Sequence, residues 1–152
     1  MLTRVSNDQN EMDIDLIHSF LSACYWSAGI PRPVLVNAMR NSLCFALLLE
    51  NDESAKKAIP ATEKPQTIGF ARMVTDKATF AYLADVFIVN EFRNKGYSQI
   101  LLDAIFAHAD IQGLRRIMLA TRDAHGLYEK YNFSEIPDPS ILMQIHSPNI
   151  YQ

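Results

Sequence analysis

The polar stretch 93–98 reads Arg93-Asn94-Lys95-Gly96-Tyr97-Ser98 and stands between two apolar stretches. The first ends at Val89 and has the β-branched and aromatic residues of a strand, and the second has apolar residues at helical spacing. The N–H groups in the first turn of a helix have no partner inside the helix, and the helix dipole adds partial positive charge there. Residues 93–98 therefore predict an anion-binding turn between a strand and a helix.

The residue types in this turn suit a pyrophosphate. Gly96 has no side chain to block a close ligand, Arg93 and Lys95 add positive charge, and Ser98 adds a hydroxyl donor. The turn lacks the Gly-Lys-Ser/Thr of a Walker loop and the Gly-x-Gly-x-x-Gly of a dinucleotide fingerprint. An ordinary surface turn with basic residues would have the same composition and is the alternative.

A second informative segment, residues 123–133, follows a strand expected over 114–121. It predicts a short helix over 123–131 at the carboxyl end of that strand, where sites of α/β proteins usually lie. Tyr128 on this helix could serve as a proton donor. The alternative is that Tyr128 packs with Leu127, Tyr131 and Phe133 in the core.

The periodicity of the remaining chain predicts alternating helices and strands around a sheet. Apart from a polar loop over 50–66, we expect strands over 1–5, 42–49, 67–74 and 79–89, helices over 12–25 and 33–41, and closing strands over 133–136 and 141–145. The chain has 152 residues, the usual size of one domain, so we expect a single domain over 1–152.

Composition excludes several classes of partner. The formal net charge of -3 argues against a protein that depends on contacts with nucleic acid phosphates. No apolar run reaches the roughly 18 residues of a membrane span, and the N-terminus lacks the apolar core of a signal peptide. Cys24 and Cys44 match no zinc spacing, so we expect no metal and two reduced thiols in a cytoplasmic protein.

The two segments together resemble the GNAT superfamily of acyl-CoA N-acyltransferases. The first, Arg93-x-x-Gly96-x-Ser98, is similar to that family's pyrophosphate loop. The second resembles its C-terminal signature and reads Ala124-His125-Gly126-Leu127-Tyr128-Glu129-Lys130-Tyr131-Asn132-Phe133. With the order of elements, the resemblance covers nearly the whole chain.

The resemblance implies an α/β (α+β) fold. It implies a mixed, mostly antiparallel sheet of six to seven strands with about four helices, and a V-shaped splay between the strands near 80–89 and 114–121. Acetyl-CoA would lie in this splay as cosubstrate. Its pantetheine arm would pair with the backbone near Val86, Phe87 and Ile88, and its pyrophosphate would bind the amides of Asn94, Lys95, Gly96, Tyr97 and Ser98.

The resemblance also assigns chemistry. Tyr128 matches the family's usual general acid, which protonates the departing thiolate. A backbone N–H at a strand bulge near Phe87 would stabilise the oxyanion. The sequence departs from the family pattern at four positions, which are Asn94, Ser98, Asn132 and Thr121. Thr121 stands where many relatives have an Asn that contacts the cofactor or a bridging water, so we expect it on the cofactor side.

Asp85 interrupts an otherwise apolar strand, where an acid is costly unless it is paired or faces a cavity. It is either the general base, directly or through water, or a structural carboxylate. Tyr25, Trp26 and Arg32 lie where the family's first two helices usually shape the acceptor pocket, although core packing and surface charge explain them almost as well.

The sequence thus predicts an N-acetyltransferase that acts on a primary amine of a small molecule or peptide. The alternative is a non-catalytic acyl-CoA-binding or regulatory module with the same fold. Exposed strand edges in such folds often pair, so a homodimer is a further expectation.

Overall fold

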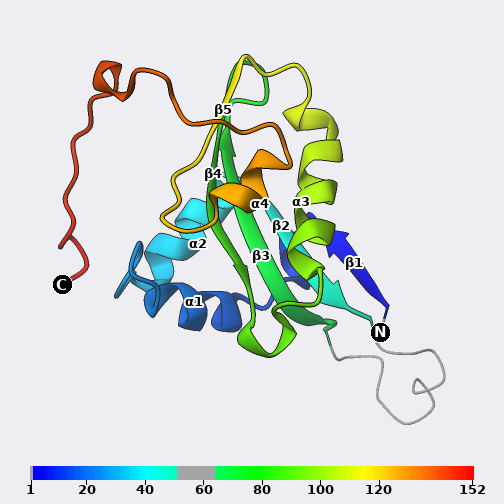
Figure 1. Cartoon of the computed structure of the whole chain (residues 1–152). Coiled ribbons are helices and arrows are strands. Elements are labelled where there is room, and N and C mark those ends of the chain that lie inside the picture. The colour runs from blue at the N-terminus through cyan, green and yellow to red at the C-terminus, as the bar shows by residue number, and fades with distance from the viewer. Residues whose placement is uncertain (1, 51–63) are drawn as a thin grey trace, which may run out of the picture. The chain divides into compact units, whose positions relative to one another are not determined.

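The apolar segments form five strands and four α-helices in the residues that the structure describes, 2–50 and 64–152 of a computed structural model (Figure 1). The strands are β1 (Thr3–Ser6), β2 (Leu43–Leu49), β3 (Gln66–Thr75), β4 (Phe80–Ile88) and β5 (Arg116–Met118). The helices are α1 (Ile14–Ser22), α2 (Arg32–Arg40), α3 (Tyr97–Ala107) and α4 (His125–Glu129). The loop expected over 50–66 lies mostly outside the described residues.

The chain divides into two compact units, Met1–Leu119 and Ala120–Gln152. The first unit holds the whole sheet, in the order β1-β2-β3-β4-β5. Strands β1 to β4 pair antiparallel and β5 pairs parallel to β4, so the expected mixed, mostly antiparallel sheet is confirmed. The expected number of six to seven strands is wrong, because the sheet has five.

The pairing between β4 and β5 is short. Residues 80–82 of β4 face Arg116–Met118, and no further pair of the described residues joins the two strands. Strand β4 continues to Ile88 beyond this ladder, and the strand expected over 114–121 is reduced to β5. Such an arrangement leaves the second half of β4 with an unpaired edge on the β5 side, as a splay between these strands requires.

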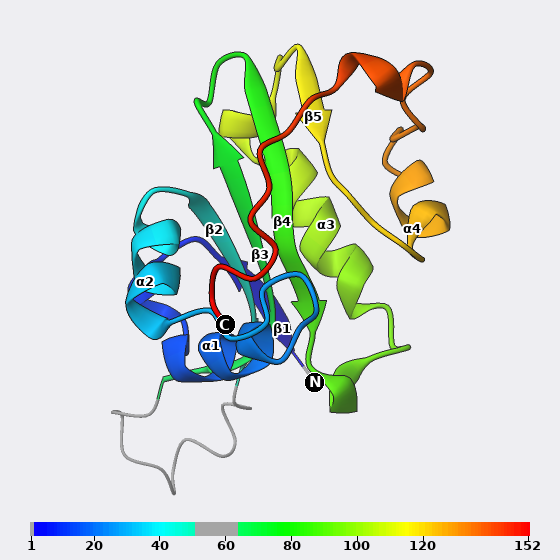
Figure 2. The same cartoon turned by 90° about the vertical axis from the view of Figure 1, so that its left-hand side faces the viewer.

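Helices cover both faces of this sheet. Figure 2 shows α1 and α2 on one side and α3 on the other. Strand β2 is buried along its length because its alternate side chains face the two helical layers. Cys44, Ala46 and Leu48 pack with α1 and α2. Helix α3 contacts β2 and β3 and buries Leu101, Leu102 and Ile105, and each fully buried aliphatic side chain contributes about 1.5–3 kcal/mol.

The hairpin between β3 and β4 turns in the gap between the strands expected over 67–74 and 79–89. Lys77 has a φ of 60°. The Asp76 carboxylate accepts hydrogen bonds from the N–H groups of Ala78, Thr79 and Phe80 at 2.8–3.1 Å. These donors, with the Thr79 hydroxyl, hold the pKa of Asp76 well below its usual range.

The second unit contains α4 and no strand, so the strands expected over 133–136 and 141–145 are wrong. Helix α4 ends in a Schellman-type cap, in which Phe133 N–H donates to Tyr128 O at 3.3 Å and Asn132 has a φ of 66°. Pro139 follows as part of a 3-10 turn at Pro139–Ile141. Residues 141–145 have strand propensity but no neighbouring strand within this unit, and propensity without pairing does not make a strand.

Among residues 2–50 and 64–152, no helix combines the length and the apolar character that a membrane crossing requires. The same residues contain no cluster of three or more His, Cys, Asp or Glu side chains arranged to hold a metal ion.

Candidate active site

The turn before α3 has the backbone geometry of an anion-binding nest. Asn94 and Gly96 adopt left-handed φ angles of 60° and 82°. No residue of the described chain accepts a hydrogen bond from the N–H of any residue in 94–98. A run of unpaired N–H groups with left-handed residues among them is a concave site for phosphate oxygens. The left-handed angle also explains Asn94, since Asn tolerates this conformation better than most residues.

The two basic side chains of this turn hold its backbone. Arg93 Nε donates to Ile88 O at 3.0 Å, and its guanidinium lies 5.8 Å from the centre of the Phe20 ring. Lys95 Nζ donates to Glu91 O at 3.0 Å. Both side chains therefore tie the turn to the chain just before it, and their charges add to the positive potential of this region.

The end of β4 is anchored by its side chains. The Phe87 ring stacks on Phe20 of α1, with ring centres 3.9 Å apart, and is buried. Ile88 is also buried and lies against Gly69, where an added Cβ would come within 2.6 Å of Ile88 Cδ1. Val86 is half-buried. These contacts fix the backbone of 86–88 beyond the end of the β4–β5 ladder.

A bulge interrupts β4 just before Phe87. Phe70 pairs with Phe87 and Arg72 pairs with Ala84, so Ala71 alone faces two residues of β4. One of the two, Asp85, has a φ of 57°. A bulge of this kind redirects a strand and its side chains. The sequence predicts a bulge near Phe87, and the structure has it at 85–86.

The Asp85 carboxylate is bound by two donors from other elements. Arg72 Nε of β3 donates to Oδ2 at 2.8 Å, and Trp26 Nε1 of the α1–α2 loop donates to Oδ1 at 3.2 Å. Only 10% of the Asp85 side chain and 18% of the Arg72 side chain are exposed. Asp85 therefore joins the α1–α2 loop to the sheet.

The aromatic residues of this loop are exposed. Tyr25 and Trp26 form an edge-to-face pair with ring centres 5.1 Å apart, and their exposed fractions are 59% and 46%. The Arg32 guanidinium makes an ion pair with Asp15 of α1 at 2.9 Å. Burial raises the pKa of the neighbouring Cys24 thiol, which disfavours a thiolate at neutral pH.

In the second unit, Tyr128 is buried and makes an edge-to-face contact with Phe133, with ring centres 5.9 Å apart. Burial raises the pKa of its phenol, so this side chain stays protonated at neutral pH. The Thr121 hydroxyl accepts a hydrogen bond from Ala124 N–H at 3.1 Å and so stabilises the start of α4.

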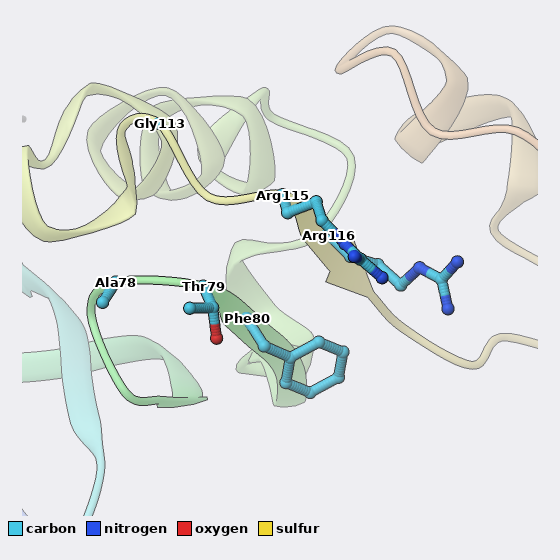
Figure 3. Close-up of a pocket in the computed structure, with 6 residues that line it drawn as sticks. All are labelled: Ala78, Thr79, Phe80, Gly113, Arg115 and Arg116. Carbon is cyan, nitrogen blue, oxygen red and sulfur yellow. The ribbon is translucent and has the colours of Figure 1, made fainter.

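A pocket of about 410 Å³ lies elsewhere, at the amino ends of β4 and β5 (Figure 3). Ala78, Thr79, Phe80, Gly113, Arg115 and Arg116 line it. The 93–98 turn follows the opposite end of β4. Both arginines are exposed, and none of the residues expected at the acetyl-CoA site lines this pocket.

Comparisons with known proteins agree on one family. Residues 19–133 match the model described as Acetyltransferase (GNAT) family. A protein of Gibberella zeae, named "Putative acetyltransferase FG08082", is 33% identical over an alignment of 135 residues that covers 83% of this chain and 75% of that protein. A GNAT-family crystal structure from Xanthomonas campestris pv. campestris has a TM-score of 0.87 and 41% identity over 99% of this chain and 97% of its own.

A more distant solved structure shares the fold alone. N-acetylglutamate synthase from Neisseria gonorrhoeae, solved with coenzyme A and N-acetylglutamate, has a TM-score of 0.61 and 15% identity over 86% of this chain and 28% of its own. The chain belongs to the GNAT acetyltransferase family.

Sequence reasoning missed two residues of this region, Arg72 and Phe20. Arg72 is an isolated charge within the apolar segment 68–74, which is the same signal that drew attention to Asp85. Two opposite charges in adjacent strands of a predicted hairpin could have been paired. Phe20 carried no signal, because it reads as one more apolar residue of an amphipathic helix.

Proposed function

We propose that this protein transfers an acetyl group from acetyl-CoA to a primary amine of a small molecule or peptide by direct attack in a ternary complex. The observation that carries the proposal is the run of unpaired amides at 94–98, which includes two left-handed residues. This arrangement suits the pyrophosphate of coenzyme A, because several N–H groups can donate to its oxygens at once.

The unpaired edge of β4 supports the placement of the rest of the cosubstrate. An extended amide chain can add to a strand edge by backbone hydrogen bonds, and the pantetheine arm contains two amides. The fixed backbone of 86–88 provides that edge next to the nest. A bulge such as the one at 85–86 can free a backbone N–H group, and in this proposal such a group stabilises the oxyanion of the thioester carbonyl.

In the proposed reaction the amine nitrogen forms a bond to the thioester carbonyl carbon, and the carbon–sulfur bond then breaks. The attacking amine must be neutral, so its proton leaves to a base. The departing thiolate takes a proton from Tyr128. The raised pKa of the buried Tyr128 phenol supports this role, because it keeps the donor protonated at the pH of the reaction.

The sequence left two roles for Asp85, that of the general base and that of a structural carboxylate. Its hydrogen bonds to Arg72 and Trp26 and its small exposed fraction support the structural role. Water in the acceptor site then accepts the amine proton.

The experiment that tests the function measures release of free coenzyme A from acetyl-CoA over a panel of polyamines, amino acids, aminoglycosides, arylamines and short peptides. Runs without acceptor serve as the control. Release that depends on one acceptor class establishes the transfer and names the acceptor. Tight acetyl-CoA binding with no release for any acceptor would instead support a non-catalytic acyl-CoA-binding module.

A further inference from the structure

We propose that Asp85 and Arg72 are positioning residues that hold the Trp26 indole in place, so that Trp26 forms a fixed wall of the acceptor site. The inference rests on the proposed function, because it takes the α1–α2 loop as the acceptor side. It assigns a role to Arg72 and gives Asp85 a task other than proton transfer.

The geometry of the bulge directs the carboxylate to this task. Asp85 adopts a left-handed φ of 57°, a conformation that costs free energy in any residue other than glycine. Its two oxygens point to donors from different elements, one on β3 and one on the loop. The left-handed backbone at the bulge thus directs the Asp85 carboxylate to two donors, Arg72 and Trp26, which it would not reach from a regular strand position.

Arg72 fixes the carboxylate from the sheet side. Its Nε donates to Asp85 at 2.8 Å, while its Nη1 donates to Ser42 Oγ at 3.1 Å. Ser42 directly precedes β2, so the guanidinium spans from β2 across β3 to β4. Since the charged groups of both partners are largely withdrawn from water, breaking their contact leaves a poorly solvated charge. The carboxylate is therefore a rigid acceptor for the indole.

The position of the Trp26 indole depends on the Asp85 carboxylate, whereas the backbone of the α1–α2 loop has other contacts. Ser27 Oγ donates to Leu21 O at 2.7 Å, and Gly29 N–H donates to Ser22 O at 2.9 Å, so the backbone on this side is tied to α1. The indole itself is 46% exposed, with Tyr25 at its edge. Loss of the Asp85 hydrogen bond should free the indole without unfolding the loop.

The test uses the fact that Trp26 is the only tryptophan in the sequence, so its fluorescence reports on this side chain alone. Asp85→Gly removes the carboxylate and accepts a positive φ without strain. Asp85→Asn keeps the backbone conformation, but its amide can accept from only one of the two donors. We expect a red-shifted emission and at least a twofold rise in acrylamide quenching for both variants. Asp110→Asn, which breaks an exposed ion pair with Lys77, is the matched control and should leave the emission unchanged.

Kinetics separate the positioning role from a base role. Asp85→Asn and Trp26→Phe should each raise the KM for the amine about threefold to tenfold with little change in kcat, the scale expected for one hydrogen bond. The double variant should be no worse than either single variant, because both remove the same contact.

Two results would overturn the inference. One is unchanged Trp26 emission and quenching in Asp85→Gly and Asp85→Asn, a measurement that needs no turnover and so stays valid if the acceptor assay fails. The other is a loss of kcat in Asp85→Asn with an unchanged KM and a pH profile that loses its acidic limb, which would make Asp85 the base.

Discussion

Replacing Gly96 tests the nest before α3, and Gly113 offers a control with nearly the same backbone. The two glycines have φ angles of 82° and 72°, and an added Cβ would meet no atom within 4 Å at either position. Alanine at each position therefore costs only the strain of a left-handed residue, about 1–2 kcal/mol. For a chain of this size that corresponds to a fall in Tm of about 2–4 °C for each kcal/mol.

The affinity for acetyl-CoA should distinguish substitutions of Gly96 from substitutions of Gly113. At Gly96 the added side chain stands beside unpaired amides, where only a bound ligand could meet it. Gly96→Glu adds a negative charge as well, so isothermal titration calorimetry should show a Kd for acetyl-CoA raised at least about tenfold, or about 1.4 kcal/mol. Gly113→Ala and Gly113→Glu should bind as the unaltered protein does. Equal affinity in Gly96→Glu and the unaltered protein, with both folded, would refute the nest as the pyrophosphate site.

Three further predictions concern titratable groups. Tyr128→Phe should lower kcat about 100-fold with an unchanged Kd for acetyl-CoA. In the unaltered protein the fall of kcat on the alkaline side should lie above pH 10, where the raised pKa of this phenol is reached, and an unchanged kcat in the variant would remove Tyr128 from the mechanism. Hydrogen bonds from Arg4 and Ser6 lower the pKa of Glu11 from 4.5 to about 2, so its contribution to stability is present above pH 4.5 and is lost as the pH falls toward 2. Thermal melts of Glu11→Gln should accordingly vary less with pH over that range than melts of the unaltered protein, and parallel curves would contradict this. Burial raises the pKa of Cys44 to about 12, so at pH 8 a thiol reagent should modify Cys24 first and reach Cys44 only on unfolding; simultaneous modification of the native protein would contradict that order.

The parts of the fold and of the site that the sequence predicted have local causes. The turn at 93–98 depends on a strand end, a glycine and a helix start that are neighbours in the chain. The turn at Asp76 depends on one side chain that accepts from the N–H groups just after it. The α4 end at Asn132 likewise uses only residues of its own turn. Local interactions of this kind form in any tertiary context, so the sequence alone could predict these turns.

The contact between Asp85 and Trp26 was beyond such reasoning for a physical reason. Trp26 is 59 residues away from Asp85 in the sequence. It reaches Asp85 because α1 packs on the sheet, which brings the α1–α2 loop that carries Trp26 close to β4. The sequence could say that a carboxylate in an apolar strand needs a partner. It did not predict Trp26 as a second partner, since that contact depends on a bulge that rotates one residue out of the strand pattern.

The strands expected over 133–136 and 141–145 failed for the opposite reason. Their β-branched and apolar residues satisfy a local rule, but a strand exists only where a second strand supplies hydrogen bonds. The same limit shortened the strand expected over 114–121 to the three residues of β5 that face β4. The length of a strand thus depends on how far its partner strand pairs with it, and the residues of the strand itself do not show which partner it has.

The nest at 94–98 is built from main-chain groups, which has a consequence for how this site can diverge between relatives. Mutation changes side chains, and the donors of the nest are not side chains. Drift is therefore restricted at Asn94 and Gly96, where a positive φ narrows the choice of amino acid, and is freer at Lys95 and Tyr97. Proteins that share little sequence could therefore keep the same backbone donors at this turn, provided that these two residues keep their left-handed conformations.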